Sequence, residues 1–167
     1  KVTRGAVEAA LRAKKPDKAL SLLASLDAGK AASDTTGEMA LLRARVLGET
    51  GQLDAAIAAL AAMREKHPAS RYLNDALVLE AELRDRAGSP LEANRLYNLA
   101  LMGNVERDER FTITARLANL SSERLSDTLS AIRYWQLIAE EDKDGNAAEE
   151  ALYRSSVLQE KTGDFEG

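Results

Sequence analysis

The fold is decided by residues 41–68, LLRARVLGETGQLDAAIAALAAMREKHP, which contain two apolar helical patterns separated by a glycine. Gly51 can take a positive φ angle and so end the first helix. Ala56, Leu60 and Met63 then follow at i, i+4 and i+7, the spacing of one helix face. Pro68 cannot continue the second helix. The stretch therefore predicts an antiparallel pair of helices joined by a tight turn.

The same design recurs along the chain at a nearly constant interval. The turn residue is repeated at intervals of 37, 38 and 37 residues, at Gly51, Gly88, Ser126 and Gly163. A small residue of the second helix recurs in register with the turns, as Ala19, Ala56, Ala93 and Ala131. Four residues later stand Leu23, Leu60, Tyr97 and Trp135, and three beyond these stand Leu26, Met63, Ala100 and Ile138. Such a period indicates stacked units, none of which can bury its apolar face alone.

We therefore predict an all-α fold, an α-solenoid of about four antiparallel helix pairs plus one further helix. Helices are expected at residues 1–13, 74–87 and 147–161, with a polar loop at 30–37 and turns at 102–107 and 143–146. The repeats are expected at about 1–33, 37–70, 74–107, 112–145 and, in part, 149–167, as one domain over 1–167. Because the sequence does not begin with Met, we expect it to be a fragment of a longer chain.

Composition narrows the classes of function. A net charge of −4 argues against a nucleic-acid interface, which is usually basic. The chain has no cysteine, so thiol chemistry, disulfides and cysteine-bearing zinc sites are excluded. No run reaches the roughly 18 apolar residues of a membrane span. Neither a Walker motif nor a dinucleotide-binding glycine motif occurs.

The residues that could be considered for catalysis or metal binding are better explained by structural roles. The single histidine, His67, precedes Pro68 at a helix end, where we expect a structural role. The segment from Asp142 to Asn146 faintly resembles a calcium loop, but its twelfth position is Tyr153 in place of the bidentate glutamate. Acidic runs on surface helices are usually solvated faces. We therefore expect a non-enzymatic protein with no catalytic residues, no metal site and no cofactor.

The motif G-Q-L-D-x-A-I-x-x-L, ending in H-P at Pro68, resembles the tetratricopeptide repeat (TPR). The T-G-D-F-E-G at residues 162–167 and the Ala93, Tyr97, Ala100 set resemble it too. The resemblance covers essentially the whole chain. The chain departs from the family where apolar first-helix residues are replaced by Arg43, Glu80 and Arg84, and its period exceeds the usual 34 residues.

The TPR resemblance implies a right-handed superhelix in which the first helix of each pair lines a concave groove. Carried over residue by residue, the protein-binding candidates are Leu41, Arg45, Glu49, Val78, Glu82, Asp85, Arg86, Arg116, Leu120, Tyr153 and Val157. Charges of both signs mixed with apolar groups are typical of a surface for a protein or peptide. The positions at which chaperone-binding members clamp a terminal carboxylate hold Leu41, Arg45, Val78 and Glu82, which does not support that activity.

The resemblance implies a non-catalytic protein–protein interaction scaffold. Long Ala- and Leu-rich arrays also resemble the periplasmic TPR regions of bacterial outer-membrane exopolysaccharide secretion proteins. This second resemblance implies a role in polysaccharide export, a polysaccharide-processing or export component as partner, and a periplasmic or cell-envelope location. The alternatives are a helical accessory region of a larger enzyme and a cytoplasmic TPR adaptor. A pentatricopeptide-type RNA binder is disfavoured by the net charge and by the period.

Overall fold

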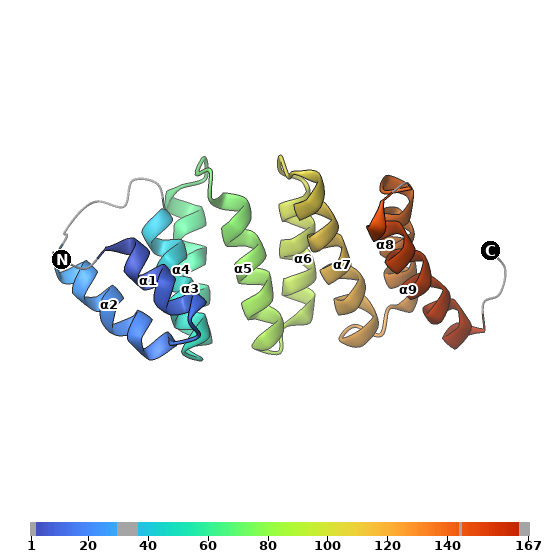
Figure 1. Cartoon of the computed structure of the whole chain (residues 1–167). Helices are drawn as coiled ribbons and strands as arrows, with labels where there is room; N and C mark the ends of the chain where they lie inside the picture. Colours follow the sequence, from blue (N-terminus) through green and yellow to red (C-terminus); the bar gives the residue numbers. More distant parts are fainter. Residues whose placement is uncertain (1–2, 30–36, 144, 164–167) are drawn as a thin grey trace. The chain divides into compact units, whose positions relative to one another are not determined.

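The regular secondary structure of the part of the chain that the structure describes is entirely α-helical (Figure 1). The computed structural model describes residues 3–29, 37–143 and 145–163, and the side chains of residues 26–29 fall outside this description. No strand occurs within these ranges, so the predicted all-α class is confirmed. The described residues form two compact units, Lys1–Ser89 (unit 1) and Pro90–Gly167 (unit 2). The boundary falls inside the expected third repeat at 74–107.

The described residues of unit 1 form five helices, each of which packs against at least one other helix of the unit. They are α1 (Arg4–Arg12), α2 (Pro16–Gly29), α3 (Glu38–Glu49), α4 (Leu53–Lys66) and α5 (Leu73–Arg86). Val7 and Leu23 join Val46 in one apolar cluster of α1, α2 and α3. Leu60 and Leu83 belong to a second cluster, which joins α3, α4 and α5. Helix α3 is therefore packed on two sides.

In unit 2, the part of the chain that the structure describes forms four helices, which pack in chain order. They are α6 (Pro90–Leu101), α7 (Arg107–Glu123), α8 (Thr128–Glu141) and α9 (Asn146–Thr162). Trp135 and Ile138 of α8 pack between Ala118 of α7 and Ala151 of α9. Arg154 of α9 lies over the Trp135 ring, with 5.9 Å from its guanidinium carbon to the ring centroid.

The repeat predicted from the turns is present in the backbone. Gly51, Gly88 and Gly163 have φ angles of 80°, 82° and 70°, in the left-handed region that favours glycine. Ser126 adopts the same conformation with a φ of 55°. So does Lys14, with a φ of 53°, 37 residues before Gly51. The backbone thus repeats its turn at five positions, one more than the sequence pattern revealed.

The second-helix pattern of small, large and apolar residues is also confirmed. The four repeated alanines at 19, 56, 93 and 131 are fully buried. The large residues that follow, at 23, 60, 97 and 135, are all buried, with at most 6% of their surface exposed. Met63, Ala100 and Ile138 are buried at the third position, whereas the Leu26 side chain lies outside the described residues. In each repeat, therefore, a buried alanine allows close helix packing, and the large residue that follows it fills the space between helices.

Most helix boundaries fall within a few residues of those expected. The helices predicted at 74–87 and 147–161 are observed at Leu73–Arg86 and Asn146–Thr162. The first helix, predicted at 1–13, is described over Arg4–Arg12. The expected loop at 30–37 lies outside the described residues except for Gly37, which has a φ of 79° next to the start of α3.

Candidate functional site

The predicted binding residues of unit 1 lie on α3 and α5, two helices that approach closely. Gly48 of α3 faces Leu83 of α5, and a Cβ atom at Gly48 would come within 2.8 Å of Leu83 Cδ2. Glycine therefore allows the two helices to come this near. Arg86 Nη2 donates a hydrogen bond to the Gly48 carbonyl oxygen at 3.0 Å and so fixes the C-terminal end of α3 to α5.

Two exposed, oppositely charged side chains project from α3. Arg45 and Glu49 stand four residues apart, on one face of the helix. Leu41 precedes them at the same spacing, but it is only 4% exposed and lies in the cluster shared with α4 and α5. It contributes to the core, because α3 is packed on two sides, and its side chain does not line an exposed surface.

Four predicted residues lie on α5. Val78, Glu82 and Asp85 are half-buried and Arg86 is exposed. Val78, Glu82 and Arg86 follow one another at intervals of four residues and so share one strip of the helix. The α3 and α5 strips meet where Arg86 reaches the Gly48 carbonyl. We call the set Arg45, Glu49, Val78, Glu82, Asp85 and Arg86 the α3–α5 face.

A buried ion pair holds α5 against α4. Glu80 is 1% exposed, and its carboxylate accepts hydrogen bonds from Arg64 Nε at 2.9 Å and Arg64 Nη2 at 3.3 Å. Arg84 Nη2 lies 3.4 Å from the same carboxylate. Glu80 stands where the TPR resemblance implies an apolar residue, and these two arginines compensate its buried charge. The sequence contains all three residues but gives no sign that Arg64 pairs with Glu80.

A second polar network lies at the N-terminal end of α3. The Tyr72 hydroxyl donates to Glu38 Oε1 at 2.6 Å, and Arg4 of α1 pairs with the same oxygen. The Tyr72 hydrogen bond, aided by the positive charge of Arg4, lowers the pKa of the Glu38 carboxyl below its usual value. This network joins α1, α3 and the residue before α5, and sequence reasoning missed it because its members lie 34 residues apart.

The remaining predicted binding residues belong to unit 2. Tyr153 on α9 is 66% exposed, and Val157, one turn later, is half-buried. On α7, Arg116 is half-buried, and burial lowers the pKa of its guanidinium. Leu120 is only 5% exposed, so it belongs to the core and does not line a surface. Of these four residues, Tyr153 is therefore the one that presents a large exposed side chain.

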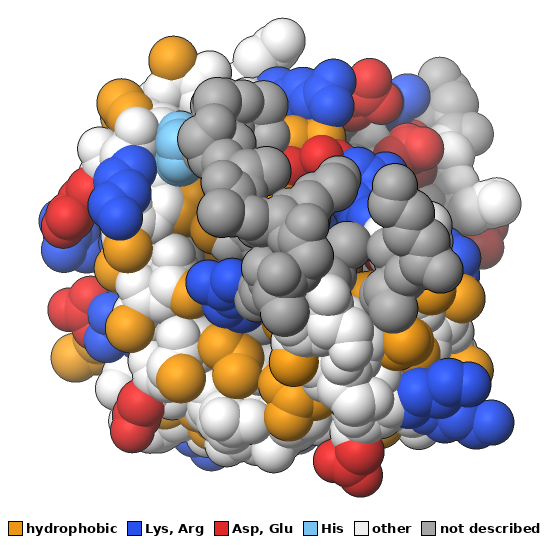
Figure 2. Space-filling model, turned by 90° about the vertical axis from the view of Figure 1, so that its left-hand side faces the viewer, with side chains coloured by type: hydrophobic (Ala, Val, Ile, Leu, Met, Phe, Trp, Pro, Cys, Tyr) orange, Lys and Arg blue, Asp and Glu red, His pale blue; other side chains and the backbone are white. Residues whose placement is uncertain are grey.

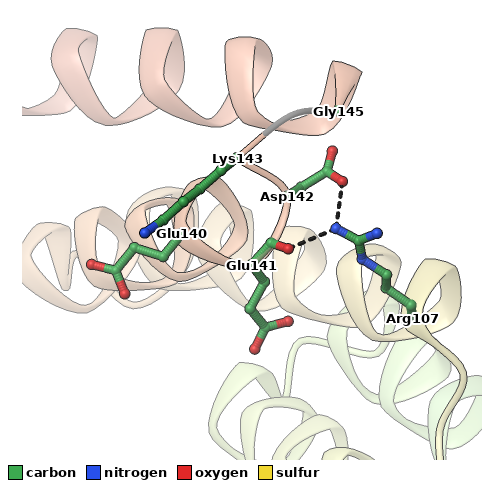
Figure 3. A pocket seen from close by; sticks show the side chains of 6 residues that line it. All are labelled: Arg107, Glu140, Glu141, Asp142, Lys143 and Gly145. Atoms are coloured by element: carbon green, nitrogen blue, oxygen red, sulfur yellow. Dashed lines mark hydrogen bonds and ion pairs between the residues drawn. The ribbon is translucent and has the colours of Figure 1, made fainter.

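A polar pocket of about 320 Å³ lies at the turn between α8 and α9 (Figure 3). Arg107 Nη2 donates to Asp142 Oδ1 at 2.8 Å and to the Glu141 carbonyl oxygen at 2.6 Å. Asp142 Oδ2 accepts from the Ala147 backbone N–H at 2.9 Å, at the start of α9. A side chain at Gly145 would collide with the Asp142 carboxylate. Both Asp142 oxygens are thus engaged in joining α7, α8 and α9.

The remaining candidates for a functional role are the single histidine, possible metal ligands and membrane-spanning helices. His67 ends α4, and its backbone N–H donates to the Met63 carbonyl oxygen at 2.8 Å. Among the described residues, no group of three or more His, Cys, Asp or Glu side chains could hold a metal ion. No helix in the described part of the chain is long and apolar enough to cross a membrane.

Comparisons with known proteins do not place the chain in a family. No protein-family model and no curated protein sequence matches it.

Proposed function

We propose that the protein is a non-catalytic interaction scaffold that binds a peptide or protein segment on the α3–α5 face. The observation that carries the proposal is the fixed approach of the two helices, through Gly48 against Leu83 and the Arg86 hydrogen bond. Because the helices are held together, the exposed charges of α3 keep their position beside those of α5. A preorganised surface loses less conformational freedom when it binds a partner.

The chemistry of this face suits a partner that carries both charged and apolar groups. Arg45 and Glu49 offer a cation and an anion one turn apart, and Val78 adds an apolar side chain on α5. Acidic, basic and apolar side chains are also interspersed on the side of the molecule seen in Figure 2. Mixed charges of this kind favour specificity for a matching protein surface over general attraction to a polyanion.

The test is selection of binders from a library of random-sequence peptides displayed on phage, with the full chain immobilised. Arg45→Glu reverses one exposed charge of the face. We expect peptides selected on the unaltered protein to bind the Arg45→Glu variant about tenfold more weakly, which corresponds to roughly 1.4 kcal/mol. Arg86 is a poorer choice for reversal, because it also fixes the end of α3.

Arg43→Glu is the matched control. Arg43 is exposed on the same helix, but two residues from Arg45, which places it on the opposite side of α3. The control should retain binding, and far-UV circular dichroism should give the same helix content for both variants. Equal loss in both variants, or unchanged binding to Arg45→Glu, would remove the α3–α5 face as the binding surface.

A role in exopolysaccharide secretion stays a prediction, as does a periplasmic location. Its test is retention of the protein on immobilised acidic and cationic glycans. If the α3–α5 face binds glycan, Arg45→Glu should change that retention as it changes peptide binding. Retention that is absent at every salt concentration would leave a protein partner as the better account.

A further inference from the structure

Exposed large apolar side chains are concentrated in unit 2. Every such residue among the described side chains lies between positions 91 and 153. Four of them are leucines on second helices of the repeat: Leu91 and Leu99 on α6 are 75% and 43% exposed, and Leu129 and Leu137 on α8 are 59% and 42% exposed. Contiguous exposed apolar side chains mark interaction sites more often than scattered ones do.

The four leucines form two equivalent pairs, each with an arginine at its centre. Arg95 lies four residues from both Leu91 and Leu99, and Arg133 lies four residues from both Leu129 and Leu137. Spacings of four place each trio on one face of its helix. Corresponding members of the two trios are 38 residues apart. We call Leu91, Arg95 and Leu99 the α6 stripe, and Leu129, Arg133 and Leu137 the α8 stripe.

The core of unit 2 does not require these stripes. The buried positions of α6 include Ala93 and Tyr97, and those of α8 include Ala131 and Trp135. The stripes lie on the other side of each helix. In unit 1 the positions equivalent to the leucines hold Asp17, Ser25, Asp54 and Ala62. The repeat therefore accepts polar or small residues at these positions, and leucine in unit 2 needs a separate reason.

We propose that each stripe binds an acidic amphipathic helix of a partner protein. Its two leucines are about 12 Å apart along the helix, at 1.5 Å per residue, which suits apolar side chains two turns apart on a facing helix. The central arginine would meet a carboxylate of the partner between those apolar contacts. Among the described residues no carboxylate pairs with Arg95, whereas Arg133 lies close enough to Asp127 to interact electrostatically.

The charges in and beside the two stripes argue against two other kinds of binding partner. A second copy of the chain docked stripe to stripe would bring arginine against arginine. An anionic membrane surface would be repelled by exposed Glu92, next to the α6 stripe, and by exposed Glu140, one turn beyond Leu137 on α8. A protein helix can instead place its carboxylates opposite the arginines alone. This proposal is independent of the α3–α5 face, which lies in unit 1.

The experiment measures fluorescence anisotropy of two labelled synthetic helical peptides titrated with the full chain. One peptide carries leucines along one face and glutamates beside them, and the other has lysine in place of each glutamate. We expect the unaltered protein to prefer the glutamate peptide. The double variant Arg95→Glu, Arg133→Glu should bind it about tenfold more weakly and should bind the lysine peptide more tightly instead. Leu99→Ser with Leu137→Ser should weaken binding of both peptides.

Arg43→Glu serves as the control for an arginine reversed elsewhere on the protein and should leave both affinities unchanged. Equal affinity of the unaltered protein and the double arginine variant for the glutamate peptide would overturn the proposal, and so would a lack of saturable binding. Two further measurements address the other occupants. Cosedimentation with phosphatidylglycerol vesicles that is lost in the double variant would assign the stripes to a membrane. A concentration-dependent dimer that is lost in the leucine variant would assign them to self-association.

Discussion

Units 1 and 2 share one repeat but differ in where they place charge and large apolar groups. Both bury the alanine and the large residue of every described second helix. Each unit buries a carboxylate, Glu80 between α4 and α5 in unit 1 and Asp142 at the turn after α8 in unit 2. The second helices of unit 1, however, have Asp17 and Asp54 on the outside. Unit 2 fills its interior with Tyr97 and Trp135 and exposes leucines. The repeat thus constrains the inward positions, and the outward positions are free to differ.

The largest expected effect comes from truncating the repeated large residue in either unit. Trp135→Ala should cost about 4 kcal/mol of unfolding free energy and Leu60→Ala about 3 kcal/mol, because each leaves a cavity in a closely packed core. Urea unfolding followed by far-UV circular dichroism measures both. A cost below about 1 kcal/mol at either position would contradict the equivalence of the two sites, since such a site would have to collapse without loss.

The buried ion pair of unit 1 gives the next largest effect. Glu80→Ala leaves Arg64 and Arg84 facing each other without their carboxylate, and we expect a loss of about 2 kcal/mol. This is less than for a fully buried pair, because both arginine side chains are about 30% exposed and can turn toward water. The control is Glu150→Ala, which removes an exposed Arg154 pair in unit 2 and should cost less than about 0.5 kcal/mol. Equal costs would show that the burial of Glu80 has no energetic consequence.

A smaller and pH-dependent effect is expected at the start of α8. Asp127 Oδ1 accepts from the Ser130 backbone N–H at 3.0 Å, and the hydrogen bonds with Ser130, aided by Arg133, lower the pKa of the carboxyl. Asp127→Ala should therefore cost about 1 kcal/mol near neutral pH. Because the folded-state pKa is the lower one, this stabilisation is complete above the unfolded value of about 3.9 and is lost as the pH falls through the folded value.

Urea unfolding of the two proteins at several pH values, followed by Trp135 fluorescence, measures this difference. The two free energies should converge in acid, at pH values below the lowered folded-state pKa of Asp127. A difference that persists undiminished in strong acid would show that Asp127 acts through packing and not through its charge. In unit 1 the equivalent N-cap, Gln52, makes no such side-chain hydrogen bond, so Gln52→Ala is the matched control.

The inward positions could be predicted from the sequence because they carry a strong pattern. Alanine, a large residue and a third apolar residue recur in register, and glycines mark most of the turns. Lys14 was missed as a turn residue because lysine gives no sign that its backbone will be left-handed. Leu41 and Leu120 were placed on a surface but are buried. The first helices lack the small-then-large pattern, so the sequence does not fix which of their apolar residues face the core.

The polar features were harder to predict, because they depend on partners far away in the sequence. The pairing of Arg64 with Glu80 can be predicted only after α4 and α5 have been positioned against each other. The network of Arg4, Glu38 and Tyr72 depends on the positions of three separate segments. The leucine stripes of unit 2 were a different kind of omission. Their 38-residue spacing is present in the sequence, but the sequence alone does not show that these leucines lie on the outward side of their helices.

The smallest expected effect concerns the two turns that lack glycine, one in each unit. Lys14 and Ser126 hold left-handed backbone conformations, which cost a residue with a Cβ atom about 1 kcal/mol relative to glycine. Glycine also has more freedom to lose from the unfolded chain, which offsets part of this gain. Lys14→Gly and Ser126→Gly should therefore each stabilise the protein by about 0.5 kcal/mol, measured by urea unfolding. A gain at only one site would mean that the other side chain makes a stabilising contact of its own, and the turns of the two units would then not be equivalent.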